Sequence, residues 1–242
     1  MIKVMINGSR GRMGQAIAAC AVESGVHISS QVDAGDDADQ FIEIVDVAID
    51  FSHHLATLPL VRTAVAHKKP IVIGTTGHSQ ADRDAIAELS NEIPMVWAGN
   101  FSIGVNLLFH LTSITAKILE NGYDAEVLEM HHRLKKDAPS GTAERLLEVI
   151  EEAKGLNPDV RTHGRAGITG ERTDNEIGVH AVRGGDIVGE HTVFFAGEGE
   201  RIELTHRASD RRIFAQGALH AAKWVAGKPA GLYNMEDVLG LR

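Results

Sequence analysis

The feature that most restricts the fold of this chain is its opening, where an apolar strand, a glycine-rich turn and an apolar helix follow one another. Residues 2–6 read IKVMI, residues 7–14 read NGSRGRMG, and an apolar helix is expected from about Gln15 to Ser24. The glycines at positions 8, 11 and 14 form a G-x-x-G-x-x-G variant of the dinucleotide fingerprint, which allows a tight turn and close approach of a pyrophosphate. A glycine pattern alone is a weak indicator. Its place between the first strand and the first helix favours a Rossmann-type domain.

The acid after the second predicted strand bears on the choice of cofactor. Residues 27–32 read as a strand that ends at Asp33, some 19 positions past Gly14, which is the spacing of an acid that binds ribose hydroxyls. A carboxylate there accepts a hydrogen bond from the 2′-OH of NADH and repels the 2′-phosphate of NADPH. Arg10 and Arg12 in the glycine turn would offset part of that repulsion. We therefore expect NADH to be used at least as well as NADPH; the alternative for Asp33 is a loop acid without a ligand.

Strand and helix patterns then alternate up to residue 100. Strands are predicted over 47–51, 70–77 with its turn, and 94–100, and helices over 55–68 and from Ser79 to about Asn91. This rhythm is typical of a doubly wound parallel sheet, in which the carboxyl ends of the strands line the ligand crevice. Candidate cofactor-binding residues are therefore Gly8, Ser9, Arg10, Gly11, Arg12, Met13, Asp33, Gly74, Thr75, Thr76, Ala98, Gly99, Asn100 and Phe101.

A second pattern begins after residue 102. A long helix is expected over 103–121, closed by Gly122, and alternating strands are expected over 176–182, 189–196 and 201–207. The predicted fold is α/β, with a Rossmann-type doubly wound parallel sheet in residues 1–102, rejoined by about 215–242. Residues 103–214 form a second α+β domain with an open, mostly antiparallel sheet, expected to bind substrate and to mediate oligomerisation. Few helices remain to cover that sheet, so self-association is expected.

The stretch Glu129–Ala143, EMHHRLKKDAPSGTA, carries the chemistry. An apolar strand over 125–130 would deliver His131 and His132 at its carboxyl end, and histidine titrates near neutrality, as a general acid must. Adjacent strand residues point to opposite faces, so one of the two histidines is expected to transfer protons. Histidine pairs also occur as solvated surface, and His53–His54 is a second such pair.

An anion site is predicted next to these histidines. Pro139 disfavours helical geometry at Ala138, and Ser140 is a good N-cap for the helix that follows. The backbone N–H groups of Gly141 and Thr142 would then face an anion, and Lys135 and Lys136 add positive charge. A carboxylate group suits this pocket.

The same stretch resembles the signature of the 4-hydroxy-tetrahydrodipicolinate reductase (dihydrodipicolinate reductase) family of lysine biosynthesis, His-His-x-x-Lys-x-Asp-Ala-Pro-Ser-Gly-Thr, with every fixed position present. The GTTG and NFS segments at 74–77 and 100–102 lie where the family has them, and the resemblance covers essentially the whole chain. One departure is Ala34, where some members carry an arginine that clamps the 2′-phosphate of NADPH.

The resemblance implies a step of the diaminopimelate route to lysine, namely reduction of 4-hydroxy-tetrahydrodipicolinate to tetrahydrodipicolinate by NADH or NADPH. It implies that His131 donates the proton and that Lys135 assists as a second catalytic residue. It also implies a homotetramer joined through the second sheet. The substrate-binding residues predicted from the pattern and the resemblance together are His132, Ser140, Gly141 and Thr142.

Composition narrows the other possibilities. A net charge of −9 argues against nucleic acid as a partner. No apolar run approaches the length of a membrane span, the single cysteine is expected in the core, and no metal site is predicted, so we expect a cytoplasmic enzyme. Two alternatives stay open: another NAD(P)-dependent oxidoreductase acting on a small dicarboxylate or hydroxy acid, and a non-catalytic module that senses dinucleotides.

Overall fold

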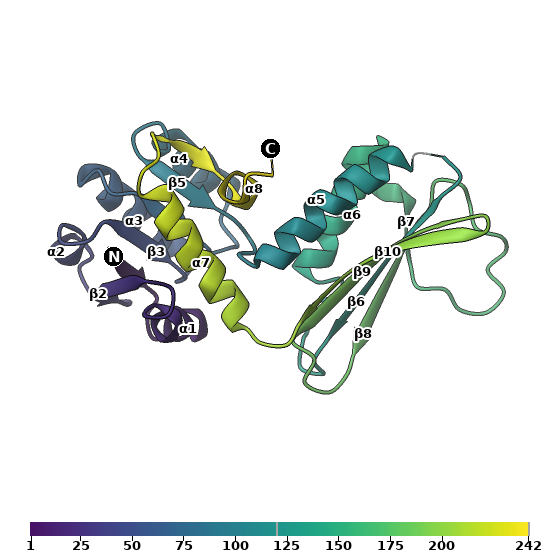
Figure 1. Cartoon of the computed structure of the whole chain (residues 1–242), viewed down its shortest axis with the longest axis horizontal. Coiled ribbons are helices and arrows are strands. Elements are labelled where there is room, and N and C mark those ends of the chain that lie inside the picture. Colours follow the sequence, from purple (N-terminus) through teal and green to yellow (C-terminus); the bar gives the residue numbers. More distant parts are fainter. Residues whose placement is uncertain (120, 242) are drawn as a thin grey trace. The chain divides into compact units, whose positions relative to one another are not determined.

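The computed structural model describes residues 1–119 and 121–241, which form two compact units (Figure 1). The first unit comprises Met1–Ile103 together with the chain from Arg211 onward, and the second unit comprises Gly104–Asp210. Glu120 and Arg242, which fell within the predicted long helix and the first predicted domain, lie outside the described residues. Among the described residues, no helix is long and apolar enough to cross a membrane.

The first unit is built on a six-stranded parallel sheet with the strand order β11-β5-β4-β3-β1-β2. Its strands are β1 (Ile2–Asn7), β2 (Val26–Val32), β3 (Val47–Asp50), β4 (Ile71–Ile73), β5 (Pro94–Trp97) and β11 (Gly231–Tyr233). Its helices are α1 (Arg12–Cys20), α2 (Asp39–Ile42), α3 (His54–Ala66), α4 (Gln80–Leu89), α7 (Arg212–Val225) and α8 (Met235–Leu239). The chain adds β2 on one side of β1 and all later strands on the other. The predicted doubly wound parallel sheet is confirmed.

Helices cover both faces of this sheet, so its strands are buried on both sides. Val4 and Ile6 pack with α1, α7 and α8 into one core, whereas Met5, between them, packs into a second core with α2, α3 and α4 (Figure 1). This double burial explains why the strands read as continuous apolar runs. It also brings their carboxyl ends to one edge, where the glycine turn after β1 and the loops after β2–β5 begin.

The second unit contains a five-stranded sheet with the strand order β10-β9-β6-β8-β7. Its elements are α5 (Ile103–Ile118), β6 (Asp124–His131), α6 (Gly141–Lys154), a 3-10 turn (Pro158–Val160), β7 (Arg161–His163), β8 (Ile177–Arg183), β9 (Gly189–Gly197) and β10 (Glu200–Ala208). β10, β9 and β6 pair antiparallel, but β6 with β8 and β8 with β7 pair parallel. The sheet is therefore mixed, not mostly antiparallel as expected. The alternating sequence pattern does not encode direction, and the crossover through α6 returns the chain parallel to β6.

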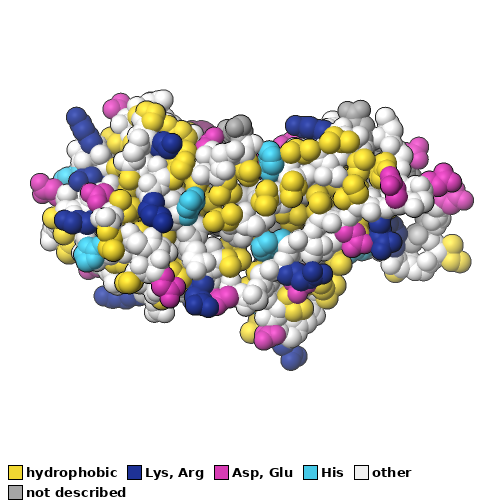
Figure 2. All heavy atoms as spheres, viewed as in Figure 1, with side chains coloured by type: hydrophobic (Ala, Val, Ile, Leu, Met, Phe, Trp, Pro, Cys, Tyr) yellow, Lys and Arg dark blue, Asp and Glu magenta, His cyan; other side chains and the backbone are white. Residues whose placement is uncertain are grey.

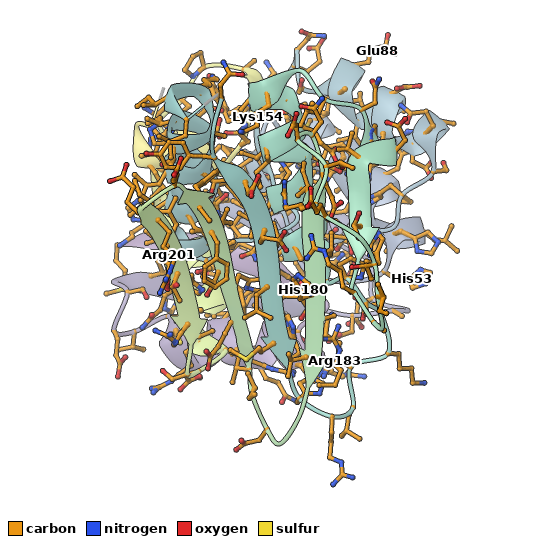
Figure 3. The ribbon with its side chains drawn as sticks, turned by 90° about the vertical axis from the view of Figure 1, so that its right-hand side faces the viewer. His53, Glu88, Lys154, His180, Arg183 and Arg201 are labelled. Atoms are coloured by element: carbon orange, nitrogen blue, oxygen red, sulfur yellow. The ribbon has the colours of Figure 1, made fainter. Side chains whose placement is uncertain are left out.

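Helices α5 and α6 pack on the face of this sheet that carries Val127, Val179 and Val193. Helix α5 is apolar on more than one side, because its buried residues Leu108 and Ala116 are joined by partly exposed apolar ones at helical spacing (Figure 2). The exposed ones are Ile103, Leu107, Leu111, Ile114 and Ile118. Among the described residues of this unit, α5 and α6 are the only α-helices, and none lies over the opposite face of the sheet (Figure 3).

Candidate active site

The glycine turn after β1 has a backbone that tolerates almost no side chain. Gly8 has a φ of +83°, and a Cβ there would lie 2.4 Å from the carbonyl oxygen of Phe51. A Cβ at Gly14 would lie 2.3 Å from the carbonyl oxygen of Gly8, because α1 starts directly against the turn. Gly11 has more room, with 3.1 Å to the same oxygen. These glycines therefore let the turn pack backbone against backbone with α1 and with the end of β3, which is the close helix–strand contact of a dinucleotide-binding turn.

Asp33 lies against this turn at the end of β2. Its carboxylate accepts hydrogen bonds from the Ser9 hydroxyl at 2.5 Å and from the Arg10 backbone N–H at 3.1 Å. The Arg10 guanidinium reaches within 3.6 Å of the same carboxylate but is largely exposed. Asp33 therefore holds the turn in place.

A cavity of about 570 Å³ opens beside Asp33 within the first unit. Its lining includes the glycine turn, the carboxylate-bearing loop after β2 and the apolar side of α3, with Pro59 and Leu60. Two further acids, Asp36 and Asp37, line it, and Ala34 stands between them and Asp33 in the chain. An apolar cavity edged by acids suits a nucleoside without a 2′-phosphate.

A buried carboxylate, Asp50, organises the ends of β1, β3 and β4. Asp50 is fully buried and accepts hydrogen bonds from Asn7 (2.8 Å), Ser52 (2.5 Å), Thr57 (2.7 Å) and Thr75 (2.9 Å). The predicted cofactor residue Thr75 is therefore buried, with its hydroxyl turned inward to Asp50. Asp50 was missed from the sequence, although an acid that ends an apolar strand was a visible signal.

Two other predicted cofactor residues, Gly74 and Phe101, also shape the unit from within. A Cβ at Gly74 would lie 2.2 Å from the Phe51 ring, so this glycine makes room for that side chain. The buried Phe101 ring stacks edge-on against Phe51 at 5.5 Å, and its carbonyl oxygen abuts Gly217 of α7. The remaining candidates at this edge are exposed or half-buried: Gly11, Arg12, Met13, Thr76, Ala98, Gly99 and Asn100.

The second unit gathers its own set of polar groups at the end of β6. His131 is buried, and its Nδ1 lies 2.5 Å from the carboxylate of Glu129, two positions earlier on the same face of the strand. Arg183 of β8 binds both oxygens of Glu129, at 2.6 and 2.8 Å, and the Ser140 backbone N–H donates to it at 3.2 Å. Burial alone would raise the pKa of Glu129, but the hydrogen bonds from His131 and Arg183 lower that pKa to about 2. Glu129 is therefore ionised.

His191 of β9 lies on the other side of His131. The two rings meet edge to face, with 5.2 Å between centroids, and His191 Nε2 lies 3.0 Å from the Ser140 hydroxyl. Burial lowers the pKa of His191 to about 3, so this ring is neutral at physiological pH. The two histidines thus differ: one faces an ionised carboxylate and the other is held uncharged.

The start of α6 adjoins this cluster. Ser140 caps the helix as predicted, accepting from the Ala143 N–H at 3.2 Å, and its hydroxyl is thus committed within the protein. Gly141, at the first helical position, is exposed, and Thr142 and His132 are half-buried. The Lys135 ammonium contacts both oxygens of Asp137, at 2.8 and 3.0 Å.

The structure therefore places the cofactor candidates in the first unit and the substrate candidates in the second. It brings His131, Ser140 and the α6 start together within the second unit. Sequence reasoning assigned no role to Glu129, Arg183 or His191. Glu129 was detectable as the residue two positions before His131, on the same side of the strand. Arg183 and His191 arrive from other strands and carried no local signal.

Family comparisons account for both units. The model described as dihydrodipicolinate reductase, N-terminus, matches residues 2–101, and the model described as dihydrodipicolinate reductase, C-terminus, matches residues 104–239. The chain belongs to the dihydrodipicolinate reductase family. The resemblance of the signature stretch is thus confirmed.

Full-length relatives in this family agree. A 4-hydroxy-tetrahydrodipicolinate reductase of Akkermansia muciniphila is 51% identical over 243 residues, covering 100% of this chain and 99% of the relative. One of Trichlorobacter lovleyi is 46% identical over 266 residues, covering 100% of both. The solved structure of a dipicolinate-bound dihydrodipicolinate reductase from Paenisporosarcina sp. TG-14 has the same fold, with a TM-score of 0.81 and 24% identity over 98% of this chain and 99% of that one.

Proposed function

We propose that this protein reduces 4-hydroxy-tetrahydrodipicolinate to tetrahydrodipicolinate, with NADH or NADPH as the hydride donor, in the diaminopimelate route to lysine. Family membership and the names of its relatives support the reaction. The observation that carries the proposal is the cluster in the second unit, where His131 faces an ionised carboxylate beside an exposed helix start. Such a cluster combines a proton donor with a site for a carboxylate.

The roles of the residues follow from this chemistry. The first backbone N–H groups of α6, at Gly141 and Thr142, bind a substrate carboxylate together with His132 and Lys135. A bound dihydronicotinamide would supply the hydride, while the substrate ring loses its hydroxyl as water. His131 holds a proton at Nε2 for the ring atom that becomes electron-rich on reduction, and Lys135 assists that proton transfer or the loss of the hydroxyl.

The glycine turn and its neighbouring cavity fit a dinucleotide. Gly8 and Gly14 permit the tight turn and the close start of α1 that a dinucleotide-binding turn needs, and Asp33 stands where the ribose hydroxyls of the adenosine half would lie. Because Asp33, Asp36 and Asp37 line the cavity and Ala34 supplies no cation, we propose that kcat/KM with NADH at least equals that with NADPH.

A single substitution tests this cofactor preference. Ala34→Arg places a guanidinium beside Asp33, and we expect it to raise kcat/KM with NADPH about tenfold, the worth of one charge-assisted hydrogen bond. The value with NADH should change much less. A wild-type preference for NADPH would contradict the role of the acids. Binding of the 2′-phosphate would then be assigned to Arg10 and Arg12.

We further propose a cytoplasmic homotetramer joined through the open face of the second sheet. Figure 3 views this sheet, with His180 and Arg201 labelled on its strands. Partly exposed apolar side chains, among them Leu128, Met130 and Phe194, alternate with polar ones on the face opposite α5 and α6. Such a face is stabilised when another copy covers it. Sedimentation equilibrium of the purified protein distinguishes a tetramer from a dimer or monomer.

The reaction is tested by the loss of nicotinamide absorbance when the protein meets substrate made in situ from aspartate semialdehyde, pyruvate and the preceding synthase. We expect turnover with NADH and, in His131→Gln, a loss of kcat of about 100-fold or more. No turnover with either nucleotide, from folded protein that still binds dinucleotide, would contradict the proposal. Turnover of oxaloacetate-like compounds instead would favour another oxidoreductase.

A further inference from the structure

Behind His131 lies an ion pair between the buried Glu129 and the half-buried Arg183, which the proposed reaction does not use directly. Glu129 has no exposed surface, and its two oxygens receive four contacts, from His131 Nδ1, two Arg183 nitrogens and the Ser140 N–H. Arg183 stands at the end of β8, directly across from His131 in the parallel pairing (Figure 3). The partners of Glu129 thus come from three segments: β6 with His131, β8 with Arg183, and the start of α6 with Ser140.

We propose that Glu129, held in place by Arg183, is the positioning residue that fixes His131 for proton transfer. This inference rests on the proposed reductase function, in which His131 is the donor. An ionised carboxylate is only an acceptor, so His131 must carry a hydrogen on Nδ1, and its Nε2 is the atom left to exchange a proton with substrate. Nε2 lies over Gly189, where an added Cβ would be only 3.0 Å away.

Arg183 also holds the loop that carries Lys135 and Asp137. Besides Glu129, its guanidinium donates to the carbonyl oxygen of Asp137 at 2.7 Å, and the next residue, Gly184, donates its N–H to the His131 carbonyl oxygen at 2.9 Å. Asp137 in turn holds the Lys135 ammonium. One arginine thus links the partner of the proton donor to the loop that carries the second catalytic residue.

The charged and titratable groups around His131 come from several elements, and Glu129 is the one whose carboxylate bonds its ring. Glu129 is the anion in contact with its ring, while Arg183, Lys135 and the neutral rings of His191 and, opposite His191 on β10, His206 lie on the surrounding elements. The carboxylate holds the hydrogen of the His131 ring on Nδ1. Removing its charge releases that hydrogen bond and leaves the guanidinium of Arg183 uncompensated.

The same strand contains a matched control. Glu126 is partly buried on the opposite face of β6, where it accepts hydrogen bonds from Arg165, Arg172 and His180 at 2.8 to 3.2 Å. Burial would raise the pKa of Glu126, but these partners lower it to about 2, as for Glu129. Glu126 thus has similar charged partners but no contact with His131. Glu126→Gln therefore measures how much activity is lost when a carboxylate of β6 that binds arginines is neutralised.

The test compares Glu129→Gln with Glu126→Gln in two measurements. Ring-nitrogen NMR of His131 should show the Nδ1–H form in the wild type and in Glu126→Gln, and a mixture of tautomers in Glu129→Gln. In steady-state kinetics, we expect Glu129→Gln to lower kcat about 100-fold with little change in KM. Glu126→Gln should keep kcat within a few-fold of the wild type.

Arg183→Lys tests whether the geometry of the Arg183–Glu129 ion pair matters in addition to its charge. A lysine keeps the charge but cannot bind both Glu129 oxygens and the Asp137 carbonyl oxygen together, so we expect a smaller loss of kcat than in Glu129→Gln. An unchanged tautomer and an unchanged kcat in Glu129→Gln would overturn the inference. Because the NMR measurement needs no turnover, a wild type that is inactive yet shows the fixed tautomer would count against the proposed reaction and not against the positioning role.

Discussion

Lys135 and Lys136 are adjacent residues with different surroundings. The Lys135 side chain is 19% exposed and its ammonium is held by both oxygens of Asp137, whereas Lys136 is exposed. The hydrogen bond from Lys135 lowers the pKa of the Asp137 carboxyl, so this contact is an ion pair at neutral pH. If Lys135 assists proton transfer, Lys135→Gln should lower kcat/KM about 100-fold. Steady-state kinetics with saturating NADH measures the change.

Lys136→Gln serves as the control, because it removes one nearby positive charge without touching Asp137. We expect its kcat/KM to fall less than about threefold at moderate salt, where exposed charges are screened. Equal losses in the two variants would mean that the loop contributes only general charge. A substrate dianion would then be attracted by the cluster as a whole and not guided to a particular ammonium.

At this scale, local sequence predicted the site only in part. The N-cap at Ser140 and the strand end at His131 were predictable because each depends on neighbours within a few positions. Arg183 and Glu129 lie 54 positions apart in the chain and meet only through the β6–β8 pairing. The inward turn of the Thr75 hydroxyl likewise depends on Asp50, 25 positions earlier.

Elements with a sustained apolar run were predictable, even short strands such as β4, and four other short elements were not. The strands and helices predicted from such runs lie close to their predicted positions, because burial on one or two faces leaves a periodic pattern. α2, β7, β11 and α8 have only three to five residues each and were missed. The direction of β8 was also missed, because a pattern of period two is the same in parallel and antiparallel pairs.

The junction of the glycine turn with α1 permits a prediction at the scale of one element. A Cβ at Gly14 would meet the backbone of Gly8 and Ser9 at 2.3 and 2.6 Å, so Gly14→Ala must push the helix away from the turn. We expect this variant to weaken NADH binding about 100-fold or more, because the turn no longer presents its N–H groups to the pyrophosphate. Fluorescence titration with NADH measures the dissociation constant.

Gly11→Ala is the matched substitution in the same turn. Gly11 has a φ of −69°, which any residue adopts, and its added Cβ would lie 3.1 Å from a carbonyl oxygen, which requires a shift of only a few tenths of an ångström. We expect NADH binding to weaken less than about tenfold. If Gly11→Ala proved as damaging as Gly14→Ala, contact with the ligand and not helix packing would explain the glycine requirement.

The stability of the whole molecule should depend on the second unit as the pH falls. The ordinary histidine pKa is 6.5, but burial lowers the pKa of His191 to about 3, so below pH 6.5 the unfolded chain takes up a proton that the folded chain refuses. The stabilising contribution of neutral His191 is complete above pH 6.5 and is lost progressively toward pH 3. One such proton reduces the free energy of unfolding by about 1 kcal/mol per pH unit. Glu126 and Glu129, with pKa values of about 2 against an ordinary 4.5, add to the loss only below pH 4.5.

The interval between pH 6.5 and 4.5 therefore separates the contribution of His191 from the contributions of Glu126 and Glu129. His191→Gln keeps a polar side chain near the Ser140 hydroxyl but cannot titrate, so its unfolding free energy should fall less across this interval than that of the wild type, by about 1 kcal/mol per pH unit. Urea unfolding followed by far-UV circular dichroism reports both units. The fluorescence of Trp97 and Trp224 reports the first unit, which contains both tryptophans. Parallel pH dependences of the wild type and His191→Gln would contradict the prediction. They would mean that His191 takes up its proton equally well in the folded and unfolded chains, which requires water to reach its ring.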